Sequence, residues 1–135
     1  MDRIILVIIF QIIVFNSSKA QTFDSTLFPL TIKFASICCG VPSDVPLKKE
    51  IKLFKTKNKI KRIKAIKISP MGREGEYWIC FKLKELSKKQ KNNFSDKLCK
   101  VTKKMTDRGN AYCENNVQVI KSELPQDVKL ENIVY

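Results

Sequence analysis

The chain of 135 residues contains no histidine and only 4 glycines. Without histidine, a serine or cysteine nucleophile lacks its usual general base. No pair of carboxylates suited to acid–base chemistry stands out among the 13 acidic residues. The lack of histidine and of a Cys-x-x-Cys spacing also argues against a zinc site. We therefore predict that the protein is not an enzyme, and we expect no catalytic residue, no metal site and no cofactor.

Long apolar runs are scarce as well. The one such run, Ile4–Phe15, follows two charged residues and precedes small residues around Ala20. A membrane-spanning helix needs roughly 20 apolar residues, and this run is shorter and contains the polar Gln11. We interpret residues 1–20 as a signal peptide and expect a secreted, extracellular product. A single membrane anchor is the alternative interpretation.

Cysteine, in contrast, is well represented in the segment that follows the predicted signal peptide. All five cysteines lie within residues 21–135, a length that suits one small domain. Passage through an oxidising compartment favours disulfides, and an odd count leaves one free thiol or an intermolecular bridge. A turn expected at Asp107–Asn110 would end the preceding helix and fold the chain back. This turn predicts a disulfide between Cys99 and Cys113.

Apolar periodicity predicts three strands, at residues 49–56, 63–69 and 76–81. In the second of them, isoleucines alternate with lysine, which gives one buried and one wet face. Turn-forming residues 70–75 separate the second strand from the third. Three consecutive antiparallel strands form a meander.

A helix is expected to cover one face of this small sheet. Apolar residues recur at spacings of three and four from Leu83 to Met105, with lysines on the other side. Asn92 and Asn93 weaken the middle of this segment, so that one long helix and two shorter helices both fit the pattern.

The segments on either side are expected to be less regular. Residues 21–37 form a predicted flexible N-terminal arm, in which Pro29 argues against a regular element. Residues 107–135 form a predicted C-terminal extension, because the charge balance turns acidic after Asn110.

The charge of the chain is strongly positive, at +13 overall. Ten basic residues lie between Lys48 and Lys67, against the single acid Glu50. A polyanion is the natural partner for such a cluster. For an extracellular protein, we expect a sulfated glycosaminoglycan rather than nucleic acid. The plainer interpretation is a solvated face that keeps the protein soluble.

The order of these features resembles the CC chemokine family. In that family, a signal peptide and an arm precede adjacent cysteines, here Cys38 and Cys39, and a loop, three strands and a helix follow. Residues 45–56 are similar to the family's segment from loop to first strand, and Trp78-Ile79-Cys80 is similar to the end of its third strand. The resemblance implies an α+β fold over residues 38–106, in which a chemokine-like three-stranded antiparallel sheet is covered by a C-terminal helix.

The resemblance also implies a disulfide between Cys39 and Cys80. The family normally has one more cysteine between the pair and the last one, and this chain has none there. Cys38 is then left unpaired and is available to link two copies into a homodimer.

The function implied by the resemblance is that of a cytokine. It would activate a heptahelical G-protein-coupled receptor and direct leukocyte migration, with the arm triggering the receptor and the loop after the cysteines docking on it. The receptor contacts carried over to this chain are Gln21, Phe34, Ile37, Gly40, Val41 and Val45.

A second implied partner is heparan sulfate or another glycosaminoglycan, which would retain the protein on cell surfaces. The implied contacts are Lys57, Lys59, Lys61, Arg62 and Lys64.

Two other functions fit the same composition. A cationic amphipathic helix would suit an antimicrobial protein that acts on anionic membranes. A heparin-binding growth or adhesion factor would need the basic residues but not the arm. Independently of function, Asn93-Phe94-Ser95 predicts a glycosylation site.

Overall fold

The computed structural model describes residues 24–135. The predicted signal peptide and the predicted receptor contact Gln21 therefore lie outside the described residues. Among residues 24–135, no helix is long and apolar enough to cross a membrane.

The described chain forms five strands, two α-helices and a short 3-10 helix. Their bounds, in chain order, are β1 Ser25–Ser36, α2 Val45–Asn58, β2 Lys64–Ser69, β3 Tyr77–Phe81, α3 Lys88–Thr102, β4 Gly109–Ile120, η1 Lys121–Glu123 and β5 Lys129–Val134.

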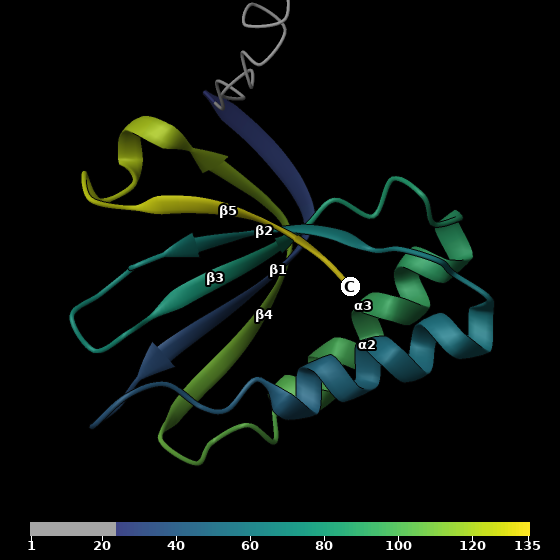
Figure 1. The fold of residues 1–135 in the computed structure, drawn as a ribbon, viewed down its shortest axis with the longest axis horizontal. Coiled ribbons are helices and arrows are strands. Elements are labelled where there is room, and N and C mark those ends of the chain that lie inside the picture. Colours follow the sequence, from purple (N-terminus) through teal and green to yellow (C-terminus); the bar gives the residue numbers. More distant parts are fainter. Residues whose placement is uncertain (1–23) are drawn as a thin grey trace, which may run out of the picture.

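The strands form one antiparallel sheet in the order β4-β1-β3-β2-β5, with β1 in the interior. Up to β4, the order of elements is β-α-β-β-α-β, the split arrangement of ferredoxin-like domains, and β5 extends the sheet beyond β2. Figure 1 shows both helices together on one side of the sheet. The predicted α+β class is confirmed, and the prediction of a three-stranded sheet under one helix is wrong.

The predicted flexible arm is strand β1 in the structure. Leu30, Ile32 and Phe34 alternate along it and are buried in the core between sheet and helices. Pro29 does not prevent pairing with β4, because the ladder pairs Phe28 and Leu30 and skips the proline, which has no N–H to donate.

The first predicted strand, residues 49–56, is also wrong, because this segment lies within helix α2. Leu47, Ile51 and Phe54 follow one another at spacings of four and three, and all three are buried. This spacing places them on one helix face. Pro46 lies in the first turn of α2, where the backbone N–H that proline lacks would have no partner within the helix.

The other two predicted strands are confirmed as the hairpin of β2 and β3. Helix α3 is shorter than residues 83–105. Ser87 begins it with a capping box, in which Ser87 accepts from the Gln90 backbone N–H and Gln90 accepts from the Ser87 N–H. Phe94 and Leu98 are buried as expected, and Asn93 is exposed. Glycosylation of Asn93 stays a prediction.

The predicted C-terminal extension belongs to the sheet. Strands β4 and β5 form its two opposite edges, and residues 121–128 connect them. Leu124 and Val128 of this connection pack against a second apolar cluster, which includes Phe28, Ile68 and Cys80. The sheet therefore has apolar packing in addition to the main core under the helices.

The cysteines follow this arrangement. Cys99 on α3 and Cys113 on β4 form a disulfide, which ties the helix to the edge strand. Cys38, Cys39 and Cys80 are free thiols, so the Cys39–Cys80 disulfide is wrong. The reason is that Cys80 lies inside the second apolar cluster, fully buried, whereas Cys38 and Cys39 are exposed after β1.

Truncation of Phe54 tests the position of α2. Phe54→Ala should lower the free energy of unfolding by about 3–5 kcal/mol, because the lost ring leaves a cavity in the core. The neighbouring Leu53 is 55% exposed, and Leu53→Ala should change the free energy by less than about 0.5 kcal/mol. Urea denaturation followed by circular dichroism measures both. Equal losses would contradict the helix register.

Thiol labelling tests the cysteine assignment. A maleimide at pH 8 should modify Cys38 and Cys39 in the folded protein and Cys80 only after unfolding. Burial shields Cys80 and raises the pKa of its thiol to about 11, so that the reactive thiolate is scarce. Peptide mass spectrometry reads the labels. A peptide that joins Cys39 to Cys80 would reverse the assignment.

Candidate polyanion-binding groove

A stripe of lysines runs along α2 beside its buried face. Lys48, Lys52, Lys55 and Lys59 follow one another at spacings of four, three and four. These are the spacings that keep side chains on one side of a helix. Lys59 is the C-cap residue just after α2 and has a left-handed backbone. The helical part of the stripe therefore runs from Lys48 to Lys55 and is about 10 Å long at 1.5 Å per residue.

The stripe borders a groove of about 580 Å³. Its rim carries five lysines, the four of the stripe and Lys61 from the connection to β2. Its apolar lining comes from Ile51, Ile60 and Tyr135. We call this surface the lysine groove.

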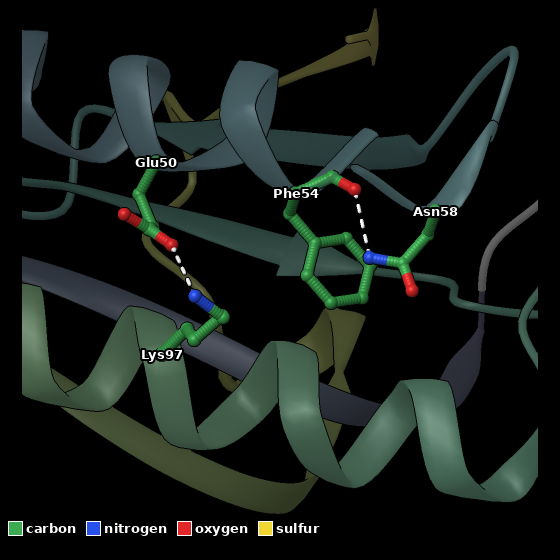
Figure 2. A network of polar contacts seen from close by, with 4 residues as sticks. All are labelled: Glu50, Phe54, Asn58 and Lys97. Atoms are coloured by element: carbon green, nitrogen blue, oxygen red, sulfur yellow. Dashed lines mark hydrogen bonds and ion pairs between the residues drawn. The ribbon is translucent and has the colours of Figure 1, made fainter. Parts of the chain in front are cut away.

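Acidic side chains hardly compensate the groove. Among the residues that the structure describes, no acidic side chain lines it, and of its five lysines only Lys48 has an ion pair, with Asp44 at 2.9 Å. Glu50, the one acid of α2, instead pairs with Lys97 of α3 at 3.1 Å, as Figure 2 shows. The lysine groove is therefore a concentrated site of positive charge.

Local helix electrostatics explain only part of this stripe. Lys55 lies in the last turn of α2, where a cation is favourable beside the free carbonyl groups. Lys48 lies in the first turn, which contains no acidic residue. A cation there is unfavourable for the helix. The ion pair of Lys48 with Asp44, the N-cap residue, offsets this effect.

Two tyrosines and Asp44 form a polar cluster beside the groove. Burial, followed by the nearby Asp44 carboxylate, raises the pKa of Tyr135 to about 12. Burial is also the largest cause of the raised pKa of Tyr77, whose hydroxyl donates to Asp44. Both rings are therefore neutral at physiological pH, and Tyr135 adds no phenolate charge to the groove.

The structure separates the basic residues that the sequence grouped together. Lys59 and Lys61 line the lysine groove. Lys57 lies on another side of α2 by helical spacing, Arg62 is exposed beyond the rim, and Lys64 pairs with Glu85 at 3.6 Å. The predicted contacts did not include Lys48, Lys52 and Lys55, which share this surface. Their helical spacing is the signal that would have shown it.

The predicted receptor contacts within residues 24–135 differ in their exposure. Phe34 is buried in the core, whereas Ile37 and Val45 are strongly exposed. Gly40 and Val41 are half-buried in the connection between β1 and α2.

A second groove, of about 530 Å³, flanks α2 on the side of α3. It is lined by apolar residues that include Val45 and Leu53, with Lys49 and Lys104 balanced by Glu50 and Asp107. This groove lacks the charge bias of the lysine groove.

Comparisons with known proteins found no matching family model, no matching curated protein and no matching solved structure. Within residues 24–135, no group of three or more histidine, cysteine or acidic side chains is placed to hold a metal ion. The lysine groove is the candidate functional site.

The pH dependence of stability tests the environment of Tyr135. Its hydroxyl ionises near pH 10 in the unfolded chain and at about 12 in the folded protein. The unfolded state therefore releases its proton first, and stability should fall as the pH rises from 10 to 12. Tyr135→Phe should lose less stability over this interval. Urea midpoints at pH 9 and pH 11 measure this difference between the original protein and the variant. If both proteins lost the same stability, the Tyr135 hydroxyl would be exposed to solvent and not buried.

Proposed function

We propose that the protein binds a sulfated glycosaminoglycan through the lysine groove and is retained by it on cell surfaces or matrix. The observation that carries this proposal is the stripe of Lys48, Lys52, Lys55 and Lys59, with Lys61 beside it and no acidic side chain among the described lining residues.

An extended ligand fits this arrangement better than a single small anion. The cations follow about 10 Å of α2 from Lys48 to Lys55 and continue past its end with Lys59 and Lys61, so that several charges of one linear polymer would each meet a lysine. Each contact releases counterions from the polymer, and the binding is therefore strongly dependent on salt. The predicted export of the chain favours a sulfated polysaccharide over nucleic acid as the polymer.

Receptor activation and direct attack on membranes stay predictions. The segment expected to trigger a receptor is paired in the sheet as β1. The apolar faces of α2 and α3 are buried in the main core. The folded domain therefore presents mainly the charged faces of its helices, and no observation favours either function over polyanion binding.

Alanine replacement of Lys52, Lys55 and Lys59 tests the proposal. The triple variant should elute from a heparin column at clearly lower salt, because each lost cation removes attraction and counterion release. Its thermal midpoint should barely change, since exposed cations contribute little to stability. Gradient elution beside thermal melting measures both effects.

A matched control removes the same charge from α3. Lys88, Lys89 and Lys100 are exposed and lie outside the lysine groove, and their triple alanine variant should elute at higher salt than the α2 variant. If the two variants eluted at the same salt concentration, heparin binding would depend on net charge alone, and the groove would not be the site.

A further inference from the structure

We infer that the lysine groove recognises the sugar rings of its ligand as well as the sulfate groups, with the ring of Tyr135 as the platform for one pyranose. This inference rests on the proposed function, because it identifies what the apolar lining of the same groove contacts.

The orientation of Tyr135 is the first reason. Its ring stacks on Phe81 with the centroids 5.9 Å apart and the planes 29° from parallel. Phe81 is fully buried, so this contact covers one face of the tyrosine from the protein side. Tyr135 is itself partly exposed and lines the groove. Part of the Tyr135 side chain is therefore available to a ligand in the groove.

The chemistry of the lining is the second reason. Ile60, which is half-buried, continues the apolar surface beside Tyr135, and the methylene stems of the rim lysines extend it. Ile51 lies beneath this surface and is buried. A polymer that carried only charge would leave this surface without a partner. A sulfated pyranose has C–H groups on its ring faces and anionic groups at its edge, which match the floor and the rim.

Other anionic ligands match less well. Single-stranded nucleic acid binds to a series of aromatic platforms, and the groove offers one aromatic ring beside two isoleucines. A site for an anionic lipid would need an apolar cavity that encloses the acyl chain. This groove is open to solvent at its rim, where four of the five lysines are exposed.

Substitutions of Tyr135 separate ring contact from charge. The probes are a heparin-derived hexasaccharide and inorganic polyphosphate, measured by calorimetry at one salt concentration. Tyr135→Leu keeps apolar volume against Phe81 but removes the flat face. It should weaken hexasaccharide binding roughly tenfold, which is the order of an aromatic stacking contact, and change polyphosphate binding less than twofold. Tyr135→Phe keeps the ring and should bind both probes like the original protein.

The lysine variant of α2 distinguishes the two proposals. Its binding to both probes should fall, and unchanged binding to both would remove the groove as a site and the proposed function with it. Equal loss of both probes in folded Tyr135→Leu would overturn the ring contact alone. Single-stranded DNA and anionic vesicles serve as two further probes. A tenfold loss of binding by Tyr135→Leu that was confined to either of them would also overturn the ring contact. Circular dichroism checks that each variant is folded, and if Tyr135→Leu unfolds, Tyr135→Met, which also keeps apolar volume without a flat ring, replaces it with the same expected outcomes.

Discussion

Burial of Leu47, Ile51 and Phe54 sets the rotation of α2 about its own axis, and the arrangement of the surface follows from that rotation. Phe54 meets Phe94 of α3 edge to face, with the ring centroids 5.0 Å apart, and Phe94 meets Phe81 of the sheet in the same way. A chain of aromatic contacts thus connects both helices to the strands. Because this face of α2 points inward, the lysine stripe must lie on the flank of the helix beside the edge of the sheet. A helix rotated by a quarter turn would bury lysines and expose the ring, which the energetics of burial forbid.

The same rotation divides the charges of α2 between two sides. Glu50 faces α3, where Lys97 neutralises it, and the hydrogen bond from Asn58 to the Phe54 carbonyl lies further along the helix (Figure 2). The other flank keeps its positive charge nearly uncompensated. Mutual repulsion among exposed lysines costs little in water at physiological salt. The fold therefore tolerates a surface that a polyanion would stabilise, and the apolar residues between the lysines give that surface a second kind of contact.

The sequence predicted what depends on neighbouring residues. The hairpin of β2 and β3 followed from alternation and a turn, and the buried face of α3 followed from helical spacing. Helix α2 was misjudged because lysines interrupt its apolar residues, and the family resemblance favoured a strand there. Strand β1 was misjudged because Pro29 argues against a ladder unless the partner strand is known, and that partner, β4, lies far along the chain. The lysine groove could not be predicted because residues on a predicted strand cannot form a helical stripe, and because Tyr135 reaches the groove only through the tertiary fold.

The pairing of β1 with β4 has a consequence for how the chain folds. Contacts across this pair join residues as far apart as Lys33 and Glu114, 81 positions, and Ser25 and Gln118, 93 positions. Loop closure over such distances slows folding relative to a domain of local contacts. While the chain is being made, β1 can pair with β3, but its other edge waits for β4. An unpaired strand rich in buried apolar residues is prone to aggregate, so the nascent chain carries its most vulnerable edge through nearly the whole of its synthesis.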